Sequence, residues 1–338
     1  MADGKKADRV TIRTVAADAG VSVAAVSKVL RSAYGVSDAL RVNVLQSIAR
    51  LGYRPNVAAR GMRGSTYTLG ILLSDLANPF LPQIIEGINA VAEPAGYKAM
   101  IGVGQSNVPI ETRMIESMID YRMDGLILVA PRLGPETLPA YAAQIPIVAI
   151  GHHEPDAPGF DTVNADDRMG AALVVAAFRA RGHQDIGMIS LDLGVDHHTN
   201  VSDLREDGYL AAMAAAGLAH KAQIRRLELN SPRSQGQLAA WLDAPDRPRA
   251  VFCWSDLHAV DLRNMAAAKG IAVPQDLAIA GFDNTYIAAL PLIDLTSVDQ
   301  AGTTLGRGSA ELLLARIAGR RVAEHRLIAP HLILRGSH

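Results

Sequence analysis

The sequence predicts a small all-α head with a helix-turn-helix, followed by an α/β body of two lobes on doubly wound parallel sheets. The spacing of small and apolar residues in positions 11 to 30 indicates the head. Short apolar runs alternate with helical stretches from residue 69 onward, and this alternation is typical of parallel sheets covered on both faces. A length of 338 residues is too great for one small core and agrees with more than one domain.

The head opens with the residue pattern of two helices joined by a sharp turn. Ala16 is small enough for two helices to approach closely, and Gly20 stands where the turn needs a positive φ. Ser22 follows as the expected N-cap of the second helix. Four valines are expected to close the core: Val15, Val21, Val26 and Val29. An ordinary helical hairpin has the same spacing, so the motif alone does not assign a function.

A third helix and a linker complete the head. Ser37 is expected to cap this helix and Gly52 to end it. Apolar residues recur between them at helical spacing, at Leu40, Val44, Leu45, Ile48 and Leu51. A short segment over 57–63 follows, with Asn56 as its expected cap, and residues 64–66 form the expected linker into the body.

The strand–helix pattern of the body runs twice, before and after about residue 162, which predicts two similar lobes with a cleft between them. Ligands of such sheets bind at the carboxyl ends of the strands. Strands are expected at Leu69–Leu73, Ala99–Val103, Gly125–Val129, Ile147–Ile150, Ile186–Ile189, Val251–Trp254 and Leu277–Gly281. Helices are expected near 82–95, 110–121, 166–181, 204–216, 233–243 and 256–269.

Composition limits the classes of protein that the chain can belong to. The single cysteine, Cys253, cannot form an internal disulfide and fits a reducing cytoplasm. No apolar stretch reaches the roughly 18 to 20 residues of a membrane span. The N-terminus lacks the apolar core of a signal peptide. We therefore expect a cytoplasmic protein with no membrane partner.

The charge is distributed unevenly along the chain. Residues 1–64 hold 11 of the 33 Lys/Arg and 4 of the 34 Asp/Glu, which leaves 22 and 30 for the rest. The head therefore has a net charge of +7 and the remainder −8. A basic head on an acidic body predicts that a polyanion binds at one end of the chain. A solvated basic surface is the alternative.

Several motifs follow one another in a fixed order through head and body. They are Val21–Leu30, Leu51–Asn56, Asn78–Phe80, Asp166–Gly170, Arg181–His183, Arg205 with Gly208, Ser255–Asp256, Gly281–Asn284 and Leu295–Val298. Each is weak alone, but the ordered set resembles the lac repressor / galactose repressor (LacI/GalR) family of bacterial regulators from about Val10 to Arg335. The resemblance implies a homodimeric repressor that binds double-stranded operator DNA and whose body is similar to periplasmic sugar-binding proteins. A small effector, expected to be a carbohydrate, would bind between the lobes.

The resemblance also implies how the chain divides. Residues 1–55 would form the helix-turn-helix domain, 56–66 a hinge helix and linker, and 67–338 the effector-binding and dimerisation domain. In this family the chain crosses between the lobes three times. The N-lobe is therefore expected at about 67–162 and 295–322, and the C-lobe at about 163–294 and 323–338.

Family resemblance also assigns DNA contacts to residues of the head. The start of the second helix would read base edges through Val23, Ala24 and Lys28. The two short apolar side chains can pack on a thymine methyl group, and Lys28 can reach a guanine O6/N7 edge. Residues expected near phosphates, which position the head without reading sequence, are Thr11, Arg13, Ser22, Ser27 and Arg31. Packing of Val23 against the third helix is the alternative for that residue.

The family's hinge segment matches Asn56–Arg63, where Asn56, Ala59 and Met62 would contact DNA. Met62 stands where relatives have a leucine that opens a minor-groove step. Gly61 costs a helix about 1 kcal/mol relative to alanine, and so short a helix is unstable in water. We expect the segment to order on the operator. Ala25 and Lys28 depart from the hydroxyl residue and arginine of many members, so the operator is expected to differ from the commonest one.

By the same match, eight residues would line the effector cleft: Asn78, Phe80, Asp166, Arg205, Trp254, Asp256, Asp283 and Gln300. Carboxylates and an arginine can each bind two adjacent hydroxyl groups, and an aromatic face can cover a sugar ring. The alternatives are core packing for Phe80 and Trp254, and a turn cap for Asp283.

Other classes of function find less support. The pairs His152-His153 and His197-His198 invite a metal site, but adjacent histidines point in different directions and no Cys cluster or HExxH accompanies them. We expect no metal and no cofactor. An enzyme remains an alternative through a carboxylate pair, Asp256 and Asp283, although the chain has no Gly-x-Ser-x-Gly motif and no P-loop. A sugar-binding receptor would need a signal peptide and no basic head.

Overall fold

The computed structural model describes residues 10–30, 34–54, 64–134, 136–192, 200–228 and 232–338. The chain divides into two compact units, Met1–Thr66 and Tyr67–His338, called the head and the body below. The predicted division into a small α-helical unit and a large α/β unit is confirmed. None of the described helices is both long and apolar enough to cross a membrane.

The described part of the head contains three helices, α1 (Ile12–Asp18), α2 (Val23–Leu30) and α3 (Asp38–Leu51). Gly20 has a φ of +65° in the turn between α1 and α2, as the motif predicts. The Ser22 hydroxyl accepts a hydrogen bond from the amide of Ala25 at 3.1 Å. Ser37 caps α3, and Gly52 ends it with a φ of +60°. The core consists of Val15, Ala16, Ala19, Val26, Val29 and Val44, with Val21 and Val23 packed against it.

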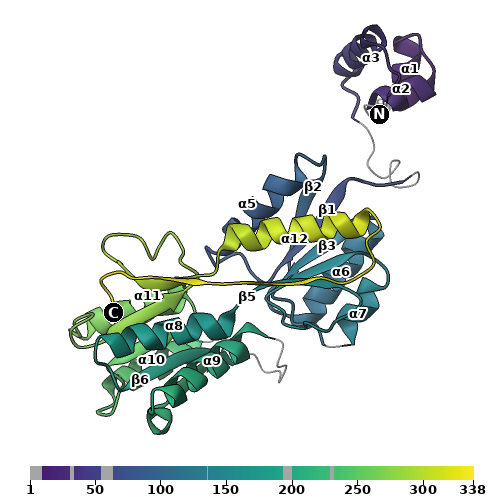
Figure 1. The fold of residues 1–338 in the computed structure, drawn as a ribbon. Coiled ribbons are helices and arrows are strands. Elements are labelled where there is room, and N and C mark those ends of the chain that lie inside the picture. Colours follow the sequence, from purple (N-terminus) through teal and green to yellow (C-terminus); the bar gives the residue numbers. More distant parts are fainter. Residues whose placement is uncertain (1–9, 31–33, 55–63, 135, 193–199, 229–231) are drawn as a thin grey trace, which may run out of the picture. The chain divides into compact units, whose positions relative to one another are not determined.

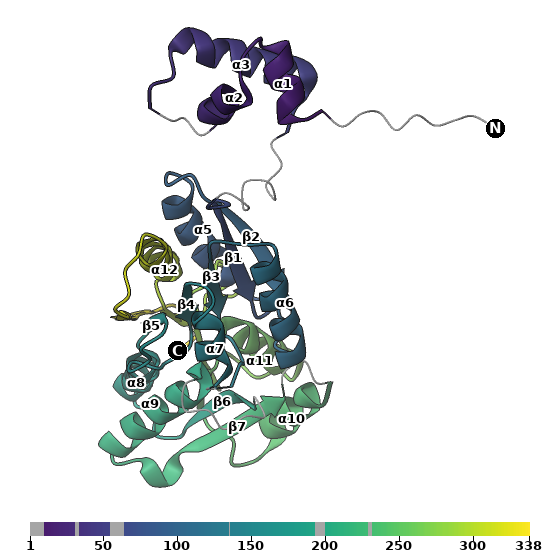
Figure 2. The same cartoon turned by 90° about the vertical axis from the view of Figure 1, so that its right-hand side faces the viewer.

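The first lobe of the body contains a sheet of six parallel strands in the order β11-β5-β4-β3-β1-β2 (Figure 1). The strands are β1 (Thr68–Leu73), β2 (Lys98–Val103), β3 (Gly125–Val129), β4 (Ile147–Ile150), β5 (Asp161–Ala165) and β11 (His325–Ile328). One face packs against α5 (Leu81–Ala92) and α12 (Gly302–Ile317). The other packs against α6 (Val108–Asp120) and α7 (Thr137–Ala142), as Figure 2 shows.

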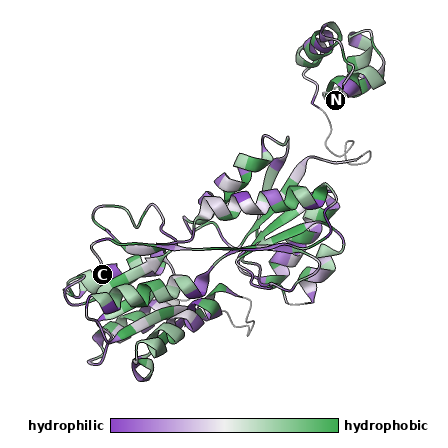
Figure 3. Ribbon diagram, viewed as in Figure 1, coloured by the Kyte–Doolittle hydropathy of each residue, from purple (hydrophilic) through white to green (hydrophobic). Residues whose placement is uncertain are grey.

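The second lobe repeats this plan with the strand order β12-β10-β9-β8-β6-β7. Its strands are β6 (Ile186–Asp192), β7 (Gln223–Glu228), β8 (Ala250–Cys253), β9 (Ala278–Phe282), β10 (Thr296–Asp299) and the antiparallel β12 (His331–Ile333). The helices α8 (Asp167–Ala180) and α9 (Val201–Ala215) cover one face, followed by a 3-10 turn at Ala219–Lys221. The helices α10 (Pro232–Asp243) and α11 (Asp256–Ala268) cover the other. The central strands are the most hydrophobic part of both lobes (Figure 3).

The chain crosses between the lobes three times, after β5, after β10 and after β11. Figure 1 shows the last crossing as the yellow segment that joins the lobes. The expected lobe boundaries are wrong in three places. Residues 163–165 continue β5 of the first sheet, β10 pairs with β9 in the second sheet, and β11 returns to the first sheet beside β5. Backbone pairing, which the apolar runs do not reveal, decides these assignments.

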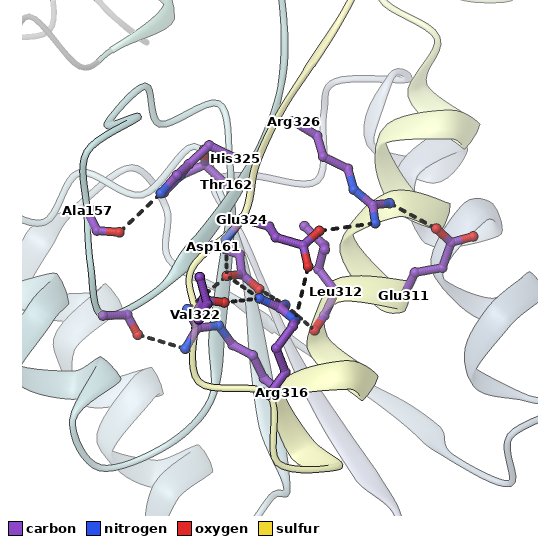
Figure 4. A network of polar contacts seen from close by, with 12 residues as sticks. Ala157, Asp161, Thr162, Glu311, Leu312, Arg316, Val322, Glu324, His325 and Arg326 are labelled. Carbon is purple, nitrogen blue, oxygen red and sulfur yellow. Dashed lines mark hydrogen bonds and ion pairs between the residues drawn. The ribbon is translucent and has the colours of Figure 1, made fainter.

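A buried ion cluster holds the segment after α12 on the first lobe (Figure 4). The Asp161 carboxylate is inaccessible to solvent and pairs with Arg316 at 2.8 Å and with Arg320. It also accepts a hydrogen bond from the amide of Glu324 at 2.9 Å. Burial by itself would raise the pKa of Asp161, but the two guanidinium groups lower it below its ordinary value. The cluster joins the end of α12 to the start of β5 and so places β11 on the first sheet.

The helices α5 and α12 touch through their backbones at glycines. A Cβ atom added to Gly306 would lie 2.0 Å from the carbonyl oxygen of Ile84, and one added to Gly87 would lie 2.1 Å from that of Thr303. These are backbone atoms, so the helices would have to separate to admit a side chain. The contact matters for the cleft because α5 follows Phe80 directly and α12 follows Gln300.

We predict that Gly306→Ala destabilises the body by about 1–3 kcal/mol, the usual cost of overpacking, although alanine is the better helix former. Gly236→Ala is the matched control, because this glycine also lies within a helix but its added Cβ has no neighbour within 4 Å. The control should gain about 0.5–1 kcal/mol. Urea unfolding of both variants checks the prediction, and equal stabilities would contradict it.

Candidate functional site

A cavity of about 1050 Å³ lies between the two lobes, at the carboxyl ends of their strands. Residues within two positions of the carboxyl ends of ten strands line it, one for each of β1 to β10: Ser74, Gln105, Ala130, Gly151, Ala165, Leu191, Glu228, Trp254, Asp283 and Gln300. Open parallel sheets bind ligands at this edge. The predicted cleft is therefore present, and both sheets contribute to it.

Six of the eight expected cleft residues line this cavity, namely Asn78, Phe80, Arg205, Trp254, Asp283 and Gln300. Asn78 and Phe80 come from the loop between β1 and α5 of the first lobe. Arg205, Trp254 and Asp283 come from the second lobe, and Gln300 lies at the crossing after β10. The cavity therefore brings together residues that are up to 222 positions apart, from Asn78 to Gln300.

Arg205 is buried in the wall of the cavity and is held by two hydrogen bonds and by contacts with two aromatic rings. Its Nε donates to Oδ1 of Asp167 at 2.7 Å, and its Nη1 donates to the carbonyl oxygen of Trp254 at 2.6 Å. The guanidinium carbon lies 3.7 Å from the centroid of the Phe282 ring and 4.9 Å from that of Trp254. Stacking and hydrogen bonds together fix the plane of the guanidinium group.

Asp283 connects the two lobes across the cavity. Its Oδ2 accepts a hydrogen bond from Nδ2 of Asn78 at 3.1 Å, and its Oδ1 accepts one from Nε2 of Gln300. The orientation of the Asn78 amide is set because its Oδ1 accepts from the amide of Phe80 at 3.0 Å. Burial, together with the nearby Asp256 carboxylate, raises the pKa of Asp283 to about 7, although Arg205, Asn78 and Gln300 act to lower it.

The other two expected cleft residues, Asp166 and Asp256, are not among the residues that line the cavity. Asp166 is the N-cap of α8, with Oδ1 accepting from the amide of Met169 at 2.9 Å. Asp256 is fully buried and accepts hydrogen bonds from the amide and hydroxyl of Thr285, at 2.7 and 2.8 Å, and from the hydroxyl of Ser297. Both carboxylates stabilise the fold around the cavity.

Asp167 and His258 line the cavity and were not expected there. Asp167 follows the cap residue of α8, so its carboxylate is not needed by the helix amides and can turn to Arg205. The pair Asp166-Asp167 could have indicated this, because one aspartate suffices for the cap. Burial lowers the pKa of His258 to about 4, so this ring is neutral near pH 7 and its Nδ1 lies 2.8 Å from the Ser255 hydroxyl.

The two expected aromatic residues differ in their surroundings. Phe80 belongs to the hydrophobic core of the first lobe and also lines the cavity, so the core alternative holds in part. Trp254 is half-buried, and its Nε1 has no hydrogen-bond partner among the described residues. An indole N–H shielded from water and without an acceptor favours a ligand that supplies one.

The histidine pairs do not form a metal site in the part of the chain that the structure describes. No group of three or more His, Cys, Asp and Glu side chains suited to a metal ion occurs there. His152 lies 3.0 Å from Oε2 of Glu154, and His153 lies 2.8 Å from Oδ2 of Asp167. His197 and His198 fall outside the described residues.

The described residues among the expected DNA contacts lie on α1 and α2 or directly before these helices. Ala24 and Lys28 are exposed and lie four residues apart, hence on one face of α2. Val23 is half-buried against the head core, which includes Val44 of the third helix. Of the phosphate candidates, Arg13 is exposed, Ser22 and Thr11 are exposed helix caps, and Ser27 is half-buried. Arg31, Asn56, Ala59 and Met62 lie outside the described residues.

Each of the two units of the chain matches a known protein family. Residues 11–56 match the family described as bacterial regulatory proteins, lacI family, and residues 175–338 match a periplasmic binding protein-like domain. The HTH-type transcriptional repressor CytR of Escherichia coli (strain K12) is 30% identical over 338 residues, covering 98% of this chain and 97% of CytR.

Two solved structures show the same architecture over nearly the whole chain. The lac repressor dimer bound to operator and the anti-inducer ONPF has a TM-score of 0.82 at 26% identity, covering 98% of this chain and 99% of its own. The complex of the transcriptional regulator CelR with cellobiose has a TM-score of 0.69 at 27% identity, covering 98% and 100%. The chain therefore belongs to the lacI family of bacterial regulatory proteins and is a DNA-binding transcriptional regulator.

Proposed function

We propose that this regulator is a homodimeric repressor that binds operator DNA through the exposed face of α2 and releases it when an uncharged sugar fills the cavity between the lobes. The observation that carries the proposal is the cavity itself. It lies at the strand ends of both sheets, and polar side chains of both lobes meet in it. A ligand that bridges Asn78 and Asp283 would change how the lobes are held together.

The charges around the cavity favour an uncharged effector. Among its lining residues the acids are Asp75, Asp167, Glu228, Asp261 and Asp283, whereas the arginines are Arg132 and Arg205. A phosphorylated or carboxylated ligand would meet an excess of carboxylates and be repelled. Hydroxyl groups can donate to these carboxylates and accept from the guanidinium and amide groups. A sugar therefore fits this lining better than a nucleotide or a sugar phosphate.

The length of the cavity favours an effector with more than one ring. Asp283 follows β9, and Glu228 ends β7, three strand spacings away in the sheet order. At 4.7–4.9 Å per spacing the two positions lie about 14 Å apart. The related CelR structure holds cellobiose, a two-ring sugar. We therefore propose a disaccharide or a sugar joined to a second ring as the preferred effector.

The same geometry argues against an enzyme. Of the carboxylate pair that the sequence offers, Asp256 accepts three hydrogen bonds from protein groups and lies outside the cavity. Asp283 is bound by two amides. A general acid–base pair needs both groups at the reacting bond. We propose a regulator without catalytic activity that acts in the cytoplasm, where its DNA is.

Retarded migration of a DNA fragment from the protein's own promoter tests the proposed function. The purified dimer should retard this fragment, and cellobiose, lactose, glucose or ribose should be screened for release. We expect release by a neutral sugar and none by glucose 6-phosphate at the same concentration. The coupling should amount to about 1–3 kcal/mol and be reciprocal, so operator should weaken sugar binding by the same factor. Failure to bind this DNA at low salt would contradict the proposal.

Substitutions in the head should separate base reading from phosphate binding. Lys28→Ala should weaken operator binding more than binding to random DNA, because Lys28 is proposed to contact a base. Arg13→Ala, the control, should weaken both about equally.

For the unaltered protein, two heads should neutralise about 6 to 10 phosphates, and the affinity for DNA should drop by about 10³ to 10⁵ between 50 and 200 mM salt. A flat salt response would exclude the head as the DNA surface.

The raised pKa of Asp283 predicts opposite effects of pH on stability and on sugar binding. Its pKa in the folded state, about 7, exceeds the ordinary 3.8, so the folded state binds the proton more tightly. The stability from this group is present below pH 4 and is lost as the pH rises to 7. Sugar hydroxyls donate best to the ionised form, so sugar affinity should increase from pH 6 to 8. Thermal unfolding with and without a sugar that binds measures both trends.

Asp283→Asn is the variant that checks this assignment, because it cannot ionise. It should unfold at a temperature that depends less on pH between 5 and 8, and its sugar affinity should be weak at every pH. Asp166→Asn is the control, since asparagine also caps a helix and Asp166 lies outside the cavity. The same pH dependence in Asp283→Asn as in the unaltered protein would contradict the role of Asp283.

A further inference from the structure

Asp167 lies where the chain first passes from one lobe to the other and contacts a residue of each. It is the first residue of α8, directly after the crossing that follows β5. Its Oδ1 accepts from Nε of Arg205 in α9 at 2.7 Å, and its Oδ2 lies 2.8 Å from Nε2 of His153, in the loop after β4. The side chains of Asp167 and Arg205 are 1% and 3% exposed, and that of His153 is 14% exposed.

We propose that Asp167 is a positioning residue that holds Arg205 in the orientation in which it binds the effector, with His153 fixing Asp167 from the first lobe. This inference rests on the proposed effector cavity. It assigns a chain of three side chains, His153, Asp167 and Arg205, that runs from the first lobe into the wall of the cavity. Arg205 thereby becomes the point at which the position of the first lobe influences the ligand.

The donors of Arg205 show which part of the side chain remains for a ligand. Nε is used by Asp167 and Nη1 by the carbonyl of Trp254, while the guanidinium plane stacks on Phe282. No acceptor for Nη2 occurs among the described residues. Nη2 is therefore the guanidinium nitrogen that can donate to a hydroxyl group in the cavity. A long side chain fixed in advance binds more tightly, because ordering it no longer opposes binding.

Asp167 is suited to this role because it is charged, buried and not needed elsewhere. A guanidinium as deeply buried as that of Arg205 requires a compensating anion nearby. The charge of Asp283 also interacts with that of Arg205, but no hydrogen bond joins the two side chains. The carboxylate oxygens of Asp283 accept from Asn78 and Gln300 instead. Asp166, the preceding residue, is occupied as the helix cap. Of these three carboxylates, Asp167 is the one that sets the direction of the side chain.

The alternative is that Asp167 itself binds the effector, since it also lines the cavity. The two roles differ in one measurable respect. A positioning residue acts through Arg205, so its loss should cost nothing further once Arg205 is gone. A direct ligand contact would be lost whether or not Arg205 is present, and the two substitutions would then be additive.

Tryptophan fluorescence tests the position of Arg205 without any ligand. The chain has two tryptophans, so Trp241→Phe leaves Trp254 as the reporter, with the guanidinium of Arg205 4.9 Å from its ring. In this background Asp167→Ala should shift the emission of Trp254 towards that of Arg205→Met. Asp166→Ala, which loses the helix cap, should leave the emission unchanged. Emission of Asp167→Ala equal to that of the parent would overturn the proposal, as would an equal shift in the Arg205→Met background.

Titration calorimetry with cellobiose, or with whichever sugar of the release screen binds, measures the consequence for the ligand. Asp167→Ala should weaken binding about tenfold or more, as the loss of a charge-assisted contact does. Asp167→Asn should restore most of the affinity, because its amide oxygen can still accept from Nε. In the Arg205→Met background, Asp167→Ala should change the affinity by less than about twofold.

The possible results separate the two proposals. Additive losses from Asp167→Ala and Arg205→Met would assign Asp167 to direct binding and overturn its positioning role, while leaving the effector cavity intact. No binding of any sugar by the unaltered protein would contradict the proposed function, and the fluorescence of Trp254 would still decide whether Asp167 holds Arg205. Apo operator affinity should stay within a few fold in all these variants, because none of the substitutions lies in the head.

Discussion

The backbone contact between α5 and α12 is the constraint on which the first lobe and its side of the cavity depend. Glycines at both sides of the contact let two helices from distant parts of the sequence touch, with no side chain between them. The loop before α5 carries Asn78 and Phe80, and the crossing before α12 carries Gln300. Gly302 continues this arrangement, because a Cβ added there would lie 2.8 Å from the Phe80 ring. The positions of three cavity residues thus follow from one helix pair.

The edge of the cavity is also where the backbone departs from its preferred conformations. Positive φ angles occur at Gln105, Ser106, Ala130, Asp283 and Ala301, all within a few residues of a strand end that faces the cavity. Residues with side chains adopt this conformation at a cost, and such strain is concentrated at functional sites. At Asp283, with a φ of 107°, the hydrogen bonds to Asn78 and Gln300 offset that cost. The turns with positive φ direct the polar groups that follow these strands into the cavity.

Strong local signals in the sequence predict much of this structure. The buried strands β3 and β4 begin and end at the predicted residues because both are continuous apolar runs, and α3 has the predicted cap and terminating glycine. The strand β5 was missed because Asp161, Thr162 and Asn164 are polar, although each is buried and hydrogen-bonded. The helix α12 was missed because three glycines weaken its helical signal. The reason for two of them, Gly302 and Gly306, appears only in the packing against α5 and the residue before it.

The site was predictable to the extent that the chain matches the motifs of the family. Asn78, Arg205 and Asp283, which the resemblance placed in the cleft, line the cavity. Asp256 has the same residue type and a similar place in the sequence, yet it points to Thr285 and Ser297. Only the three-dimensional arrangement distinguishes a carboxylate that lines the cavity from one that joins two loops. The pair Asp166-Asp167 indicates that one aspartate is not needed as the helix cap, but only the structure shows that Asp167 contacts Arg205.

The three crossings of the chain have a consequence for how this protein can evolve. The head is one continuous segment, so a single recombination event near residue 66 could exchange it and give the body a new target on the genome. Neither lobe is continuous, because β11 and β12 lie close together in sequence but belong to different sheets. No single continuous gene fragment therefore encodes one lobe, and the two lobes are inherited as a pair. A new effector preference can therefore arise by substitution within the cavity or by exchange of the whole body, but not by exchange of one continuous lobe.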